Sequence, residues 1–260
     1  MAKHLRKIFY FTTLLILAAG FLIWGLWQID SVEKELESMV FRSYLKLRRV
    51  TPKTFPVAAD IEFVYPHYQK FGVGVNLNIP FISQAPFAIW DELHDHACEE
   101  AAIIMVYYYL FGKELTQDAG ERDILSMVDW QIENWGGHFD LSAKQIVQLF
   151  RIYYDYQNIE LVYDYGVEDI KKELAIGNPI VVPAAGRVLG NPYFTLPGPE
   201  YHVLVIKGYD DEKYEFIVND PGTKRGADFR YNYQVLQNAI HDFNQGDVLS
   251  GRKVMIVVKK

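Results

Sequence analysis

The chain has 260 residues, of which 50% are apolar and 15% are aromatic, and its formal net charge at neutral pH is −7. This composition indicates a packed globular domain and excludes an intrinsically disordered chain, while the negative charge argues against nucleic acid as the main partner. A single cysteine, Cys98, excludes an intramolecular disulfide, so the fold depends on its apolar core.

The first predicted element is the uncharged apolar segment 8–28. A helix of this length, at about 1.5 Å per residue, covers the roughly 30 Å hydrocarbon core of a bilayer. Lys3, Arg6 and Lys7 precede the segment, and the positive-inside rule therefore places the N-terminus in the cytoplasm. The sequence predicts a single-pass protein of the cell membrane whose remaining chain is extracytoplasmic.

A cleaved signal peptide is the alternative interpretation of the same segment. Ala18 and Gly20 are small residues of the kind that precede a cleavage site. Cleavage there would leave an apolar stretch at the new N-terminus, which favours an uncleaved anchor. The predicted organisation is then a cytoplasmic tip and anchor at 1–28, a stalk or linker at 29–60 and one folded domain at 61–260.

The first half of this domain is predicted to be helical, after short strands and turns at 61–83. Residues 98–111 are nearly all apolar and are followed by Gly112, which is typical of a buried central helix that ends at a glycine. Further helices are predicted from Thr116 to about Asn134, from Ser142 through Tyr153, and over 167–177.

The second half of the domain has the shorter apolar runs of strands. The predicted strands are 178–185, 202–209, 214–220 and 252–260, with a helical segment at 233–243. Helices that precede an antiparallel sheet along the chain indicate an α+β fold.

Cys98 has three interpretations on the basis of its neighbours. Most free cysteines are small buried hydrophobes. A zinc site would use His94 and His96, but their spacing is not that of common zinc sites and there is no second cysteine. The third interpretation is a nucleophile: with Asp95 or His96 as N-cap, Cys98 lies in the first helical turn, where free N–H groups and the helix dipole favour the thiolate.

A nucleophile needs a base, a group that orients the base, and donors for the oxyanion. His202 begins a strand after a long loop rich in Gly and Pro, and Asp220 ends the next strand, at the same end of a hairpin. Gln84 precedes Cys98 by 14 residues and could donate from its side-chain amide. Each also has a purely structural interpretation: a histidine bonded to a carbonyl, a residue that starts a turn, and an exposed loop glutamine.

The register of this hairpin decides whether the histidine and the aspartate can meet. Side chains alternate along a strand, and a two-residue loop at Asp211-Glu212 would put His202 and Asp220 on opposite faces. The pair therefore requires a three-residue connection, Asp210-Asp211-Glu212, or a bulge near Asn219. Either should bring an Asp220 oxygen to about 2.6–3.2 Å from a ring nitrogen of His202, with the other nitrogen toward Cys98. If Asp220 pointed away, Asn219 would be the next candidate to orient the base.

Three stretches, 80–110, 201–210 and 218–223, resemble the bacteriocin-processing (double-glycine-leader) peptidase-like family, a group of papain-like cysteine peptidases. The resemblance covers roughly residues 78–222. It implies a papain-like α+β fold with a central helix packed on an antiparallel sheet. It also implies Cys98 as nucleophile, His202 as general base and acid, Asp220 as the residue that orients His202, and Gln84 as oxyanion donor.

The sequence therefore predicts a membrane-anchored, extracytoplasmic thiol hydrolase that cleaves a peptide or protein substrate without a metal or organic cofactor. A catalytically silent papain-like module that binds a peptide or a cell-wall ligand is the alternative. Acyl transfer or amide hydrolysis on a non-protein substrate would use the same thiol chemistry. Neither a leader-peptide specificity nor a transporter domain can be inferred, because the sequence has no phosphate-binding motif of the G-x-x-x-x-G-K-[ST] type.

Overall fold

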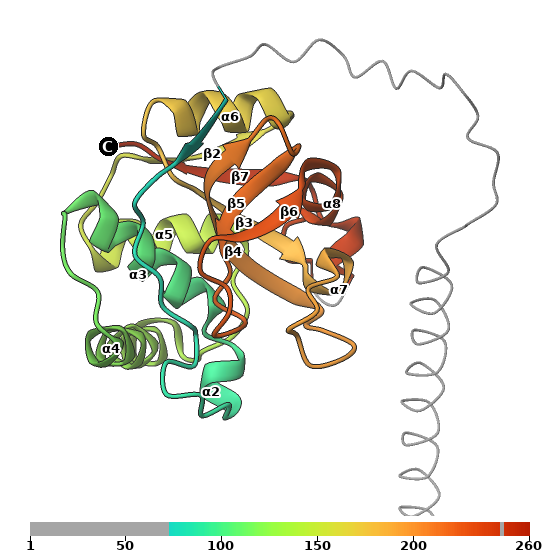
Figure 1. The fold of residues 1–260 in the computed structure, drawn as a ribbon. Helices are drawn as coiled ribbons and strands as arrows, with labels where there is room; N and C mark the ends of the chain where they lie inside the picture. Colours follow the sequence, from blue (N-terminus) through green and yellow to red (C-terminus); the bar gives the residue numbers. More distant parts are fainter. Residues whose placement is uncertain (1–72, 245–246) are drawn as a thin grey trace, which may run out of the picture. The chain divides into compact units, whose positions relative to one another are not determined.

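The computed structural model describes residues 73–244 and 247–260 (Figure 1). The predicted anchor, the signal-peptide alternative, the stalk and residues 61–72 all lie outside these ranges. Within these ranges, the helices are all too short or too polar to span a bilayer.

The described residues begin with a short strand and a run of helices, and most of the strands follow in the second half. In chain order these are β1 (Gly74–Asn76), α2 (Glu92–Asp95), α3 (Cys98–Leu110), α4 (Gln117–Trp135), α5 (Ala143–Tyr153), β2 (Ile159–Tyr163), α6 (Val167–Ala175), β3 (Ile180–Ala185), α7 (Gly186–Leu189), β4 (Tyr201–Asp210), β5 (Glu215–Asn219), β6 (Phe229–Asn232), α8 (Tyr233–Ala239), a 3-10 turn (Val248–Ser250) and β7 (Val254–Val258).

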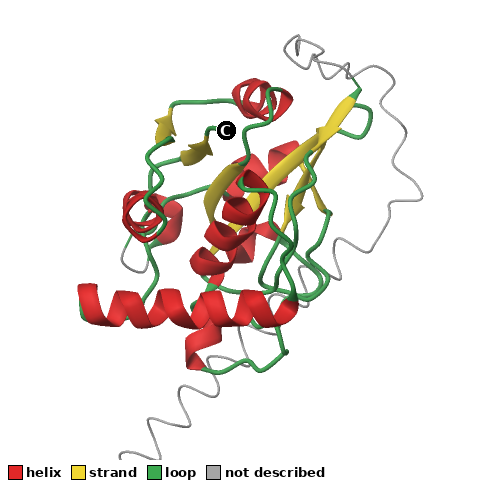
Figure 2. Ribbon diagram, turned by 90° about the vertical axis from the view of Figure 1, so that its left-hand side faces the viewer, coloured by secondary structure: helices red, strands yellow, loops and turns green. Residues whose placement is uncertain are grey.

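The strands form one antiparallel sheet in the order β2-β7-β3-β4-β5-β6, and the short β1 pairs with β4. Strand β4 is the longest and pairs with β5 on one side, while β3 and then β1 share its other side. Helix α3 and its neighbours cover one face, and α6 and α8 cover the other (Figures 1 and 2). The predicted α+β arrangement with a central helix on an antiparallel sheet is therefore confirmed.

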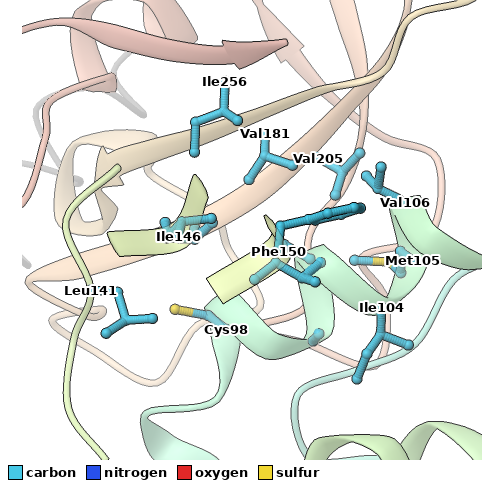
Figure 3. Close-up of a cluster of buried hydrophobic side chains, with 14 of the residues drawn as sticks. Cys98, Ile104, Met105, Val106, Leu141, Ile146, Phe150, Val181, Val205 and Ile256 are labelled. Carbon is cyan, nitrogen blue, oxygen red and sulfur yellow. The ribbon is translucent and has the colours of Figure 1, made fainter. Parts of the chain in front are cut away.

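The core has two parts because the sheet is covered on both faces. Alternate residues of one strand divide between them, so that Val181 contacts the α3 side while Ile180 and Val182 contact the α6 and α8 side. Beyond Glu99 and Glu100 in its first turn, helix α3 has apolar residues on all sides, and it is buried along most of its length. Figure 3 shows this part of the core, in which Phe150 of α5 lies between α3 and the sheet residues Val181 and Val205.

The capping residues set the helix boundaries close to those predicted. Thr116 accepts a hydrogen bond from the Ala119 N–H at the start of α4, and Ser142 begins α5 in a capping box with Gln145. The N-cap of α3 is Ala97, however, and the prediction of Asp95 or His96 is wrong. The reason is that Asp91 caps a separate short helix, α2, which ends at Asp95 immediately before α3.

The β4–β5 hairpin contains the register shift on which the candidate site depends. Its connection has four residues, 211–214, because Asp210 pairs with Glu215, so the predicted three-residue connection is wrong. A bulge restores the required parity, but it lies at Lys207 in β4 and not near Asn219 in β5. Beyond the bulge Val205 pairs with Asn219, and this register turns the side chains of His202 and Asp220 to the same face.

Candidate active site

The site lies where β4 begins and β5 ends. The segment that contains Gln84 reaches this point because the carbonyl of Pro221 accepts hydrogen bonds from the Gln84 N–H (3.0 Å) and from the Ser83 hydroxyl (3.1 Å). Asn219 fixes the same segment from the other side, since its amide donates to the carbonyls of Ile79 and Pro80 (both 3.1 Å). Asn219 therefore serves as a structural clamp and does not contact His202.

A cavity of about 720 Å³ opens between these segments. Gln84, Cys98 and His202 all line it, so the structure brings three of the four predicted site residues to one space. Aromatic and apolar side chains form much of the remaining wall, together with a few polar groups at the rim. The principal ones are Trp90, Tyr193, Phe194, Pro199, Asp95 and Lys224.

His202 and Asp220 form the predicted pair. His202 Nε2 lies 2.7 Å from Asp220 Oδ1, within the expected range, and both side chains are buried. The edge of the His202 ring is covered by Phe194, whose ring centroid lies 5.3 Å away in an edge-to-face arrangement. Because Nε2 is engaged by the carboxylate, Nδ1 is the nitrogen that His202 can offer to a reacting group.

Three further donors hold the carboxylate of Asp220. Its Oδ2 accepts hydrogen bonds from the hydroxyl of Tyr231 (2.7 Å) and the amide of Asn191 (3.0 Å), and Oδ1 accepts one from the Gly222 N–H (3.1 Å). Burial by itself would raise the pKa of Asp220, but the charge of His202 and these side-chain hydrogen bonds together hold that pKa below its ordinary value. Asp220 is therefore ionised at neutral pH and suited to fix the orientation of His202.

Sequence reasoning missed Asn191 and Tyr231. Both are buried: Asn191 also donates to the Tyr231 hydroxyl (2.9 Å), and the ring of Tyr231 packs in the core beside Phe229. Tyr231 lies on β6, a strand that the sequence did not indicate, and Asn191 lies in the loop before β4. The Asn-Pro step at Asn191 was the one available signal, but it is common in ordinary turns.

Cys98 is the first residue of α3, as predicted, and its sulfur points toward Leu141 (Figure 3). The thiol donates a hydrogen bond to Oε2 of Glu99 at 2.9 Å. Burial and the adjacent Glu99 carboxylate raise the pKa of Cys98 well above the ordinary thiol value. The expectation that the start of the helix favours the thiolate is therefore wrong for this state, because burial and neighbouring negative charge outweigh the helix dipole.

Gln84 lies in the cavity wall, and its side-chain amide points toward backbone carbonyls of the α2 segment. Its Nε2 donates to the backbone carbonyls of His94 (2.8 Å) and Asp95 (3.1 Å), while its Oε1 is buried and has no partner among the described residues. Both amide hydrogens are thus used to hold the α2 segment next to Cys98. An oxyanion role for Gln84 requires one of these hydrogen bonds to be released.

The histidines before α3 have partners that explain their presence. His94 Nδ1 lies 2.7 Å from Asp91 and its Nε2 lies 3.2 Å from Glu121, while His96 contacts Asp140 at 3.2 Å. His94 is buried within α2.

A comparison with protein families matches residues 76–245 to the Peptidase_C39-like family. The match spans more than half of the chain and includes all four predicted site residues. This chain belongs to the Peptidase_C39-like family. The family expected from the sequence is confirmed, and the chain is accordingly assigned to the cysteine peptidases.

The chain is also similar to solved structures of other peptidases. A protein from Bacillus anthracis described as a C39-like peptidase has 18% identity and a TM-score of 0.46, over 72% of this chain and 98% of that one. The peptidase domain of Streptococcus ComA, a bifunctional ABC transporter of a quorum-sensing pathway, has 12% identity and a TM-score of 0.40, over 70% and 99%. Xylellain, a cysteine protease from Xylella fastidiosa, has 16% identity and a TM-score of 0.37, over 73% and 86%. No curated protein matches the chain.

Proposed function

We propose that this chain hydrolyses peptide bonds with a Cys98–His202–Asp220 triad, in an extracytoplasmic domain with a papain-like fold that residues 8–28 anchor to the cell membrane. The observation that carries the proposal is the buried hydrogen bond of 2.7 Å between His202 and Asp220, at the wall of a cavity that Cys98 also lines. A histidine that is oriented by a carboxylate and shares a cavity with a thiol has the groups that activate a cysteine nucleophile.

The reaction begins with proton transfer from Cys98 to Nδ1 of His202. The thiolate attacks the scissile carbonyl, and the tetrahedral oxyanion receives hydrogen bonds from the Cys98 N–H at the start of α3 and from Gln84 after its amide is released. His202 then gives its proton to the leaving amine, and water hydrolyses the thioester with His202 as base. Asp220 remains ionised and holds Nε2 throughout.

The form of the cavity supports a peptide as the substrate. The exposed aromatic side chains of Trp90 and Tyr193, at 46% and 45% exposure, can cover apolar substrate side chains. Lys224 and Asp95 at the rim offer charged partners for peptide termini or side chains. Nothing else in the site is needed for a reaction that uses only thiol, imidazole and carboxylate groups.

One observation favours the alternative of a silent peptide-binding module. The thiol of Cys98 is bonded to Glu99, and its raised pKa opposes the reactive thiolate. A module that had lost activity could retain this arrangement together with the cavity. The two functions differ in whether peptide cleavage requires the sulfur atom.

The deciding experiment incubates the full-length chain in detergent micelles with a tryptic digest of a bacterial lysate. New peptide termini and any thioester on Cys98 are then measured by mass spectrometry. We expect cleavage by the native chain, none by Cys98→Ala, and strongly reduced cleavage by His202→Gln. Peptide binding without new termini, equal in the native chain and in Cys98→Ala, would establish the binding module instead.

The proposed topology is tested separately in intact cells. Protease added to spheroplasts should digest the domain, while a tag at Met1 should stay protected. A protected domain would contradict the topology, and a mature chain that lacks the first residues through Gly20 would identify a signal peptide.

A further inference from the structure

Glu99 is the closest polar contact of the proposed nucleophile. It follows Cys98 in the first turn of α3, and its side chain is fully buried. Oε2 accepts the hydrogen bond from the Cys98 thiol at 2.9 Å, and Oε1 accepts one from the Leu141 N–H at 2.7 Å. Among the described residues, no lysine or arginine forms an ion pair with this carboxylate, which a buried charge would ordinarily require.

The surroundings of Glu99 are acidic. From α3 it faces Cys98 and Glu100, from the segment before α5 it faces Asp140, and Tyr201 of β4 and Asp242 after α8 lie near the same point. Two histidines of this region are paired with other acids, since His96 contacts Asp140 at 3.2 Å and His138 lies 3.6 Å from Glu100. Burial, followed by the charges of Glu100 and Asp140, raises the pKa of Glu99 well above that of an ordinary carboxyl group.

We infer that Glu99 is a further catalytic residue, which shares a proton with Cys98 and by its own protonation state decides whether the nucleophile can become a thiolate. The inference rests on the proposed function, in which Cys98 is the nucleophile. It assigns a chemical role to an acidic residue next to the thiol that the triad does not use.

The protons of Cys98, Glu99 and His202 are distributed in two ways, depending on whether Glu99 is ionised. When Glu99 is ionised, its Oε2 accepts the S–H of Cys98, and removal of that proton would leave two negative charges about 2.9 Å apart in a buried place. When Glu99 is protonated, the S–H proton passes to Nδ1 of His202 and the Glu99 O–H donates to the thiolate sulfur. Glu99 keeps its own proton while the S–C bond forms, so that the site holds a thiolate, an imidazolium and a neutral carboxyl group.

This balance predicts that the reactivity of Cys98 falls at high pH, which the reactivity of a plain thiol–imidazole pair does not do. The reactivity of a plain pair rises with pH until the thiolate is fully formed. Here the reactivity of Cys98 rises as the thiolate forms and then falls as the pH passes through the pKa of Glu99, because the ionised carboxylate restores the thiol. The protein is therefore most reactive on the acidic side of that pKa.

Glu99→Gln tests the inference with little change of shape. The amide oxygen can still accept from the Leu141 N–H, and the amide N–H₂ is a neutral donor to the thiolate at every pH. Glu100→Gln is the matched control, because Glu100 is equally buried in the same helical turn but accepts its hydrogen bond from Gln131 and not from Cys98.

The measurement is the rate of Cys98 alkylation by iodoacetamide in the full-length chain, from about pH 4 to about pH 9. We expect the native chain and Glu100→Gln to lose reactivity on the alkaline side, with the loss at a lower pH in Glu100→Gln because the charge of Glu100 no longer raises the pKa of Glu99. Glu99→Gln should retain it and react at least about tenfold faster than the native chain near pH 8, which corresponds to one pKa unit. A Glu99→Gln profile that follows the native profile would overturn the inference.

Three further outcomes are decisive. If Glu99→Gln does not fold, the native profile decides, since a rate that only rises toward the ordinary thiol range contradicts the inference. If peptide cleavage depends on Cys98 and His202 while Glu99→Gln behaves like the native chain, the triad stands and only the role of Glu99 fails. If cleavage does not depend on Cys98, the proposed function itself fails.

Discussion

His202 Nε2 and Asp220 Oδ1 lie 2.7 Å apart because β4 contains one residue more than the part of β5 that it faces. The extra residue, Lys207, lies between the pairs Ile206–Val218 and Gly208–Ile217. If Lys207 were instead paired with Val218, the register near the loop would continue to Asp220, and side-chain alternation would turn Asp220 to the face opposite His202. A single bulge thus decides whether the base has an orienting partner.

Asp220→Asn should lower the rate of cleavage by roughly 10³- to 10⁴-fold, by analogy with the loss of the orienting aspartate in a serine peptidase triad. The amide keeps the size of the side chain but removes the charge that fixes Nε2 of His202. The turnover rate with a peptide identified from the digest measures the effect. Asp228→Asn, an exposed acid outside the cavity, should cleave at the native rate. An Asp220→Asn variant within tenfold of native activity would leave a thiol–imidazole dyad as the mechanism.

Tyr231→Phe should destabilise the domain by about 1–3 kcal/mol at neutral pH, the cost of a lost hydrogen bond to a buried charge. The folded-state pKa of Asp220 is lowered, so its stabilising contribution is present above the unfolded value of about 3.9 and is lost as the pH falls through the folded value. Removal of the Tyr231 hydroxyl raises the folded pKa, and acid unfolding should begin at a higher pH. Urea unfolding at several pH values tests this, with the half-exposed Tyr193→Phe as control.

Gly222→Ala should impair cleavage more than stability. A methyl group at this position would lie 2.9 Å from Cε1 of His202 and 2.9 Å from a ring carbon of Phe194, so the imidazole ring has to shift. Gly137→Ala is the control, because its methyl group would meet only the Phe139 side chain at 3.4 Å. Steady-state cleavage and thermal unfolding separate the two effects. A Gly222→Ala chain with native turnover would show that the ring has more freedom than its packing indicates.

The helices could be predicted from the sequence because their signals are local. Thr116, Ser142 and Gly112 mark helix ends through hydrogen bonds and backbone angles that involve only a few neighbouring residues. Strands β2 and β6 escaped prediction because short strands gain their stability from partners distant in the sequence. The four-residue turn and the position of the bulge are likewise properties of the pair of strands, not of either strand alone.

The candidate site was predictable in its residues but not in its charges. Cys98, His202 and Asp220 could be named from their residue types and their order along the chain. The raised pKa of Cys98 could not, because it depends on how deeply α3 is buried and on Asp140, which lies 42 residues from Cys98 in the sequence. The two hydrogen bonds that the Gln84 amide donates to backbone carbonyls could not be predicted either, because they depend on the fold of the short helix α2.

The pairing of Gly74 with Asp210 has a practical consequence for work at surfaces. Asp210 ends β4 and His202 lies near its beginning, eight residues away, or roughly 26 Å at about 3.3 Å per residue. A fusion partner, a sensor chip or a bead coupled ahead of Gly74 is therefore joined to the domain at the end of β4 remote from the cavity. Immobilisation through that end should leave the mouth of the cavity open to macromolecules as large as a folded protein.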